Sequence, residues 1–527
     1  MIRRVLQSAF VHHAGFFSLA RTILACAFSL AAAGAANAQS PRIWDVAPQG
    51  SDSNPGTERA PFLTIQRAAD VVSPGDTVIV EDGVYTGVGT GTSCGSSSRP
   101  VVCLSRGGTA DAWVTIQARH AGGAKLDGRS NTSTHGFYFK GASYVTISGF
   151  EIFGMGSSSG AAHGVMIDLG HDVVLSQLHL HDIGRVCTST SLGLTGVFVR
   201  VPHVTITRSV FHDIGRFLPG ENGCTATTAA HFDHAIYVSG EYYSSTTPGA
   251  SDTLITNNIF YRLQRGWSVH LYPGTLPRMT ILNNTFAFPD TPGEDGQIII
   301  AASTSDSLIM NNTFYSPRNA AIYYYTGTQT NLQISNNIVY GSTKLMTSVP
   351  SGTAISRTMF TDPQLVDAVI EPYDFHLLAV SPAINAGVNL PEVTTDFDGV
   401  ARADGKTDIS AYEFVGGVIQ KVAAPLISPD GGTVTGPITL TISTATPGAT
   451  IRYTLDGSVP RSSSPVYTAP LTIRTPTTVK AIASASGMTD SDVTTANFQL
   501  ETPSVDTTSA NQRPGPSVGT LAAGEAE

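Results

Sequence analysis

The sequence predicts an all-β chain: a parallel β-solenoid followed by a small immunoglobulin-like β-sandwich. Three observations lead to this prediction. Paired strand patterns recur over residues 136–340, asparagine doublets recur at one place in that repeat, and residues 422–500 alternate short apolar strands with Asp-Gly turns. A fixed period of roughly 20–50 residues is typical of stacked repeats, and short alternating strands separated by turns are typical of a sandwich.

The repeat can be measured from apolar anchors that hold the same place in segments such as VTISGFEIF and LIMNNTFYS. Successive anchors lie 28, 31, 49, 26, 28 and 25 residues apart, which fits one coil of a solenoid. We therefore expect residues distant in sequence to align in files across the coils. The anchors are Ile147, Leu175, Ile206, Ile255, Ile281, Ile309 and Ile334.

A second strand with alternating apolar residues precedes the anchors. Alternation sends one set of side chains into the core and the other set outward. These strands are 136–140, 164–168, 196–200, 235–239, 268–272 and 297–301.

Asparagine doublets occupy one turn of four coils. Asparagine tolerates a left-handed backbone, and its amide can bond the same amide one coil along. We expect a structural ladder rather than a metal site. The doublets are Asn257-Asn258, Asn283-Asn284, Asn311-Asn312 and Asn336-Asn337.

Residues 1–38 have the pattern of a signal peptide, with arginines before an apolar run that ends in Ala36-Asn37-Ala38. We expect cleavage near Ala38-Gln39 and export to the periplasm or the extracellular space. No other window approaches the length of a membrane span. Removal of Cys26 with this segment leaves four cysteines, and in an oxidising compartment an even count suggests two disulfides. The pairs that we expect are Cys94–Cys103 and Cys187–Cys224.

The composition argues against several classes of partner. Removing the three arginines of the signal peptide from the 30 basic residues leaves 27 against 40 acidic ones, a net charge of −13. Such a chain is a poor binder of nucleic acid or of an anionic membrane. We expect a monomer whose partner is a polysaccharide, and a polyanionic one would need a local basic patch or bound cations.

The chain divides beyond the signal peptide into three parts. Residues 39–415 form the solenoid with its two ends, and 422–500 form the sandwich. Residues 501–527 contain almost no large apolar side chains, so burial cannot offset the entropy of ordering them and we expect a disordered tail.

Two parts of the sequence carry a family resemblance. The opening VAPQGSDSNPGT…PFLTIQRAADVVSPGDTVIVEDGVY (46–85) and the later segments 374–387 and 396–414 resemble secreted right-handed parallel β-helix proteins of the pectate lyase-like superfamily, which include many polysaccharide lyases. The resemblance implies a single-stranded right-handed β-helix, with a capping helix at Thr64–Val72 and a first strand at Thr77–Val80. Lyases, hydrolases and epimerases share these features.

The sandwich resembles the C-terminal domain of chitobiase and β-hexosaminidase. The residues that carry this resemblance are 451–460, 464–467 and 479–483. The resemblance implies an accessory module, and a spacer is favoured over a glycan-binding role.

The outward face of the strands that precede the anchors is our leading candidate site. Its residues offer stacking and hydrogen-bonding groups to a sugar chain lying across the coils. Loops 186–195, 217–232 and 240–251 would form a wall beside this face, because a Cys187–Cys224 bridge would join two of them. The outward pairs are Tyr138/Lys140, Met166/Asp168, Phe198/Arg200, Tyr237/Ser239, His270/Tyr272 and Ile299/Ala301.

Other charged residues offer weaker candidates. Arg185, Arg216 and Arg265 each lie ten places after an anchor and should stack. Asp182 and Asp213, with the histidines that precede them, are the favoured counterions; a carboxylate-binding strip is the alternative. Asp233 could act as an acid, a base or a cation ligand. His234 shares a file with His135 and His163, which predicts a histidine stack.

Three functions fit this face, and a lyase is favoured. β-Elimination needs a base for the C5 proton of a uronate and a positive charge for its carboxylate. Lys140, Arg200, Tyr237 or His270 could be the base, and Arg200, Arg216 or a Ca²⁺ ion could neutralise the acid. Lysine or arginine would need a depressed pKa for this role.

A glycoside hydrolase would need two carboxylates, and Asp168 and Asp233 are the best pair. An epimerase acting on the same face remains part of this second alternative. A non-catalytic glycan-binding or surface structural protein is the third.

Overall fold

The computed structural model describes residues 40–86, 94, 99–189, 191–226, 232–241, 249–263, 265–288, 295–368, 371–402, 405–415, 421–461, 464–485, 488 and 490–500. The signal peptide expected at 1–38 and the tail expected at 501–527 lie outside the described residues. In the described part of the chain, no helix is long and apolar enough to cross a membrane.

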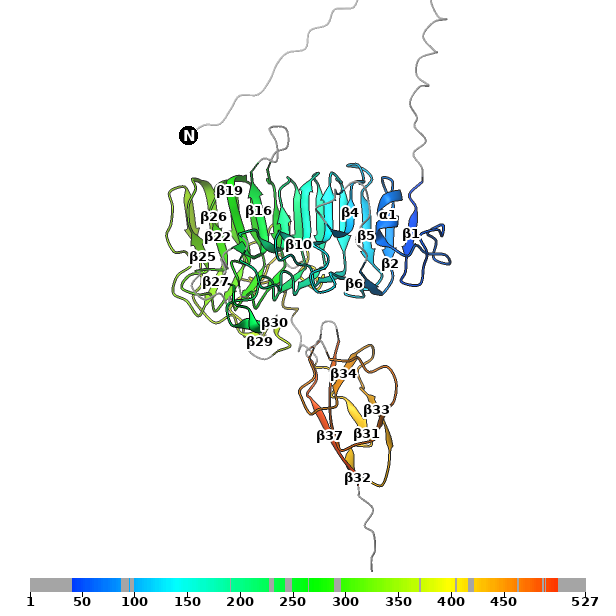
Figure 1. Cartoon of the computed structure of the whole chain (residues 1–527). Helices are drawn as coiled ribbons and strands as arrows, with labels where there is room; N and C mark the ends of the chain where they lie inside the picture. The colour runs from blue at the N-terminus through cyan, green and yellow to red at the C-terminus, as the bar shows by residue number, and fades with distance from the viewer. Residues whose placement is uncertain are drawn as a thin grey trace, which may run out of the picture.

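The greater part of the described chain is a parallel β-helix whose coils each contribute strands to three stacks (Figure 1). The first stack comprises β4 (Pro100–Leu104), β7 (His135–Lys140), β10 (Ala162–Leu169), β13 (Leu194–Val199), β16 (His234–Gly240), the start of β19 (Val269–Pro277), β22 (Ile298–Ile300) and β25 (Ile322–Tyr324). The second comprises β1 (Ile43–Val46), β2 (Thr77–Val80), β5 (Val114–Ala118), β8 (Val145–Ser148), β11 (Val173–Ser176), β14 (Val204–Thr207), β17 (Leu254–Thr256), β20 (Thr280–Leu282), β23 (Ser303–Met310), β26 (Gln329–Ser335) and β28 (Thr353–Ser356), with the end of β19 paired to β23. The third comprises β3 (Gly83–Tyr85), β6 (Ala124–Asp127), β9 (Phe150–Phe153), β12 (His179–His181), β15 (Val210–His212), β18 (Ile259–Phe260), β21 (Thr285–Ala287), β24 (Thr313–Tyr315) and β27 (Ile338–Tyr340).

The predicted anchors align in a single file of the second stack. Ile147 pairs with Leu175, Leu175 with Ile206, and the file continues in register to Ile334. Each of the seven anchors is at most 2% exposed, so the file forms one wall of the core. The predicted repeat is therefore confirmed coil by coil.

The asparagine doublets divide two tasks between their members. The first asparagine of each doublet adopts a left-handed backbone, with φ between 51° and 58°. The second forms the ladder: Asn284 Oδ1 accepts from the main-chain N–H of Asn258 at 2.9 Å and from its Nδ2 at 3.0 Å. Asn312 and Asn337 repeat this pattern one coil further on. Because the second asparagines are buried, the ladder provides hydrogen bonds to polar atoms that water cannot reach.

The first coil is capped by α1 (Ile65–Val71), as predicted. The hydroxyl of Thr64 accepts from the main-chain N–H of Arg67 at 3.1 Å and so caps the helix N-terminus. β2 has the predicted bounds, although β1 precedes it and pairs with it in parallel. At the other end, β29 (Leu365–Asp367) and β30 (Asp374–Leu377) form an antiparallel pair whose apolar residues share a small core with third-stack residues such as Ile259 and Ile338.

The C-terminal unit is a β-sandwich, as expected. One sheet contains β31 (Leu426–Ser428), β33 (Ile438–Ser443) and β35 (Leu471–Ile473). The other contains β32 (Gly431–Val434), β37 (Thr494–Leu500), β36 (Thr477–Ser484) and β34 (Thr450–Thr454). Leu440, Val479 and Phe498 lie in its core, which is separate from the core of the β-helix.

Both predicted disulfides are formed, Cys94–Cys103 and Cys187–Cys224. Disulfides persist in oxidising compartments, so these two bonds are consistent with the predicted export.

Candidate functional site

The predicted outward file exists on the first stack. Tyr138 pairs with Met166, Met166 with Phe198, and the file continues through Tyr237, His270 and Ile299 to Tyr323. The second members of the predicted pairs do not all align in one file. The strand register shifts after Ile167 in β10 and after Val238 in β16.

A groove of about 710 Å³ runs over this file. It contains four of the predicted site residues, namely Arg200, Tyr237, His270 and Tyr272; Lys140, Asp168 and Asp233 are not part of its lining. The groove is lined by Ala161, His163, Met166, Ser191, Leu192, Gly193, Thr195, Phe198, Arg200, Phe232, His234, Tyr237, Trp267, His270, Tyr272, Ile299, Ala301, Tyr323 and Tyr325.

Aromatic rings follow one another along the groove. The ring centroids of Phe198 and Tyr237 lie 4.9 Å apart, and those of Tyr237 and His270 lie 5.0 Å apart. Further along, Trp267 lies 5.3 Å from His270 and 6.1 Å from Tyr323. Rings of this kind combine a large apolar face with polar edges. The groove can therefore offer stacking surfaces over several successive coils.

Some residues that line the groove were not predicted from the sequence. Tyr323 and Tyr325 alternate outward in AIYYYT, which has the period-two pattern of the other first-stack strands and could have been found by it. Trp267 stands three places before His270, just ahead of its strand. Leu192 and Phe232 come from loops whose conformation no periodicity predicts.

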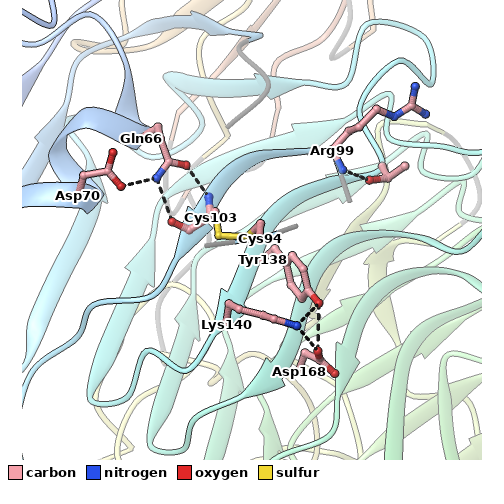
Figure 2. The surroundings of a disulfide bond; sticks show 9 residues. Gln66, Asp70, Cys94, Arg99, Cys103, Tyr138, Lys140 and Asp168 are labelled. Carbon is pink, nitrogen blue, oxygen red and sulfur yellow. Dashed lines mark hydrogen bonds and ion pairs between the residues drawn. A yellow bond between two sulfur atoms is a disulfide. The ribbon is translucent and has the colours of Figure 1, made fainter. Parts of the chain in front are cut away.

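A charged cluster lies where the groove begins, around the carboxylate of Asp168 (Figure 2). Asp168 accepts from the Tyr138 hydroxyl at 3.0 Å and from Arg200 Nη1 at 2.9 Å, and Lys140 Nζ lies 3.4 Å from it. Asp168 is only 3% exposed. In this structure Asp168 holds Arg200, whose guanidinium also lies 5.1 Å from the centre of the Phe198 ring.

Lys140 is ill suited to be the predicted base. Burial alone would lower its pKa, but the hydrogen bond to Tyr138 and the negative charge of Asp168 together raise the pKa above its ordinary value. The ammonium group therefore keeps its proton at neutral pH. Lys140 therefore contributes positive charge beside Arg200.

His270 and Tyr237 are the titratable pair in the middle of the groove. His270 Nδ1 lies 2.9 Å from His234 Nε2, and this hydrogen bond fixes the orientation of the His270 ring. Burial, assisted by interactions with the neighbouring Tyr272 and Glu241, raises the pKa of the Tyr237 phenol, so that it remains protonated. Tyr237 can therefore donate a hydrogen bond, and the His270 ring is held in one orientation beside it.

Asp233, predicted as an acid, a base or a cation ligand, lies outside the groove lining and is engaged by Arg216. It is 0% exposed and forms a two-point ion pair with Arg216, with Nε–Oδ2 and Nη2–Oδ1 distances of 2.7 Å each. The same pair binds the loop at the groove wall, because Asp233 accepts from the Leu194 N–H and Arg216 donates to the Leu192 carbonyl, at 3.0 Å each. The backbone of Gly266 packs closely here: a Cβ at that position would lie 1.8 Å from the Asp233 carbonyl oxygen.

The arginine file has different counterions from those predicted. Asp233 pairs with Arg216, and Glu221 pairs with both Arg185 and Arg265. Arg216 and Arg265, which the sequence offered as substrate-binding residues, are 0% and 2% exposed and do not line the groove. Arg185 is less buried but faces a second cavity, outside the groove. The Cys187–Cys224 disulfide joins the two loops that these arginines support.

The predicted histidine stack is confirmed only for its first two members. The rings of His135 and His163 are parallel, with centroids 5.3 Å apart. Thr195 occupies the next position of this file, and His234 contacts His270 instead. Burial lowers the pKa of His135 to about 4 and that of His163 well below its ordinary value.

The described residues offer no metal centre: they contain no group of three or more His, Cys, Asp or Glu side chains arranged to hold an ion.

The fold and its groove define the class, a parallel β-helix protein with an aromatic groove on its first stack. The model of the family described as "Pel9A-like, right handed beta helix region" matches residues 44–200, and that of the "Chitobiase/beta-hexosaminidase C-terminal domain" matches residues 429–495. Both resemblances drawn from the sequence are thereby confirmed. No match was found among curated proteins.

Three solved structures with similar folds are distant from this chain in sequence. Pectate lyase Pel9A is 15% identical with a TM-score of 0.48, over 72% of this chain and 97% of its own. An alginate lyase from Paenibacillus sp. is 19% identical with a TM-score of 0.39, over 60% and 95%. A lacto-N-biosidase from Eubacterium ramulus is 14% identical with a TM-score of 0.36, over 60% and 67%.

Proposed function

We propose that this chain is an exported carbohydrate-active protein that binds a uronate-containing glycan along the groove and cleaves it by β-elimination. The observation that carries this proposal is the file of aromatic rings crossing successive coils, with Arg200 at one end and the His270–Tyr237 pair in its middle. A sugar chain that packs its apolar faces on these rings brings its ionisable groups beside them.

The proposed reaction assigns one task to each of three groups. His270 accepts the C5 proton, the electrons of the C–H bond form the C4–C5 double bond, and the bond between C4 and the glycosidic oxygen breaks. Tyr237, which its raised pKa keeps protonated, donates a proton to the departing oxygen. Arg200 neutralises the carboxylate, whose charge grows as the proton leaves.

Charges in the groove favour elimination over hydrolysis. A glycosidase places two carboxylates on either side of the scissile bond. The described residues that line the groove include no aspartate or glutamate. Asp168 and Asp233, the pair suggested by the sequence, are both buried and engaged by cations.

Glycan binding without cleavage is the second candidate, and the mostly apolar lining favours it. Incubating the protein with uronate-containing glycans and recording ultraviolet absorbance distinguishes the two, because elimination creates an unsaturated uronate and binding does not. We expect new absorbance. Retarded migration in a glycan-containing gel without new absorbance would support binding alone.

Three variants test the assignment of roles. We expect His270→Gln and Tyr237→Phe to lower kcat by about 100- to 10,000-fold, the usual contribution of a positioned acid or base. Arg200→Gln should also lower kcat strongly. His203→Gln is the matched control, since its side chain is 54% exposed and does not line the groove. Activity that survives all three groove variants would contradict the assignment.

A further inference from the structure

Positive charge in the groove is confined to one end. Arg200 is the only lysine or arginine among the described lining residues, and Lys140 lies beside it around Asp168. Asp168 offsets one of these two positive charges. His163 adds none at neutral pH, because burial lowers its pKa well below the ordinary value.

The other end of the groove is apolar and aromatic. From β19 to β25 its described lining consists of Trp267, His270, Tyr272, Ile299, Ala301, Tyr323 and Tyr325. Trp267, Ile299 and Ala301 form an apolar cluster with Tyr323 packed against it. Tyr325 is 64% exposed and extends this surface outward.

The groove extends well beyond the part that lies near Arg200 and Lys140. It spans the coils from β10 to β25, five intervals of about 4.8 Å each, or about 24 Å. A glycan in it therefore places several sugar units over the floor. At most the units near β10 and β13 meet Arg200 and Lys140.

A carboxylate on every sugar would be unfavourable in such a groove. An ionised carboxylate taken from water to an apolar surface without a partner costs several kcal/mol. The described residues provide no cation cluster and no metal-binding group at the aromatic end. The net charge of −10 for the whole chain adds general repulsion of polyanions.

We infer that the groove is selective for a heteroglycan in which a uronate unit is flanked by uncharged sugars, rather than for a homopolymer of uronates. The inference rests on the proposed function and specifies its substrate class. The uronate lies at the Arg200 end, within reach of Tyr237 and His270. Uncharged sugars stack on Trp267, Tyr323 and Tyr325.

The test compares kcat/KM of the full chain on three defined polymers: pectate, the same polymer after partial methyl esterification, and hyaluronan, in which a uronate alternates with an uncharged amino sugar. We expect at least a tenfold preference for hyaluronan or the esterified polymer over pectate. Tyr325→Ala should lower kcat/KM on the preferred polymer, and Tyr325→Lys should raise it on pectate. Phe360→Ala is the control, because this ring is 53% exposed and does not line the groove.

Two outcomes distinguish a failure of this inference from a failure of the proposed function. Equal or better cleavage of pectate, with no gain in Tyr325→Lys, would overturn the inference and leave elimination in place. Absence of both unsaturated product and binding with all three polymers would overturn the proposed function and the inference together.

Discussion

At the residue scale, most charged side chains beside the groove hold one another in place. Asp168 fixes Arg200, Asp233 fixes Arg216, and Glu221 joins two further arginines. Burial of these groups is tolerable because each charge has a partner, and removing one partner leaves the other charge buried and uncompensated.

The Arg216–Asp233 pair gives the first prediction. Asp233→Asn should cost about 3–5 kcal/mol of stability, because it leaves the Arg216 guanidinium buried without its counterion. The measurement is the urea midpoint for unfolding of the β-helix. Asp252→Asn is the matched control, since its pair with Arg278 lies at the surface and should cost about 0–1 kcal/mol. Similar losses for both variants would contradict the structural role of Asp233.

His135 gives a prediction for pH. Burial lowers its pKa in the folded chain to about 4, against an ordinary value of 6.5. Between these values the unfolded chain binds more protons, so stability must fall as pH falls from 6.5 to 4. Each pKa unit corresponds to roughly 1.4 kcal/mol. The shift from 6.5 to about 4 therefore lowers the free energy of unfolding by about 3 kcal/mol in acid.

His135→Phe should reduce this acid sensitivity while keeping a ring against His163. Urea midpoints at pH 7 and pH 4.5 provide the measurement. His120→Phe is the control, because the His120 side chain is 72% exposed. If the His135→Phe and wild-type chains lose stability equally on acidification, the buried histidine does not cause the loss.

At the element scale, the turns matter as much as the strands. A strand pair repeated in register fixes the coil, and in the four coils with asparagine doublets the turn between second and third stacks combines a left-handed residue with a buried amide. Asparagine serves both needs, and for this reason it appears twice in succession.

The ladder can be tested at Asn284. Asn284→Ala removes the acceptor of the Asn258 main-chain N–H and the donor to the Ile255 and Leu282 carbonyls. Buried groups left without partners cost about 1–3 kcal/mol each, so for these three groups we expect a loss of about 3–9 kcal/mol in a denaturation experiment. Gln333→Ala, on an exposed position of β26, should change little. A loss below 1 kcal/mol at Asn284, roughly one net hydrogen bond, would refute the ladder as a stabilising element.

At the scale of the whole molecule, the sequence predicts register far better than burial. The anchors and the outward file from Tyr138 to Ile299 could be found because period and alternation fix which face a side chain takes. The burial of Asp168, Asp233 and Arg216 could not, since it depends on side-chain contacts between coils and, for Arg216, on the loop that carries Leu192. Trp267 and Leu192 join the groove for the same reason.

The central claim is that a glycan lies along the groove across successive coils. The most direct measurement is a crystal structure of the His270→Gln variant with a uronate-containing oligosaccharide. We predict sugar rings over Phe198, Tyr237 and Trp267, with a carboxylate of the oligosaccharide at Arg200. Oligosaccharide bound only at the sandwich or on another face of the β-helix, with the groove empty, would contradict it.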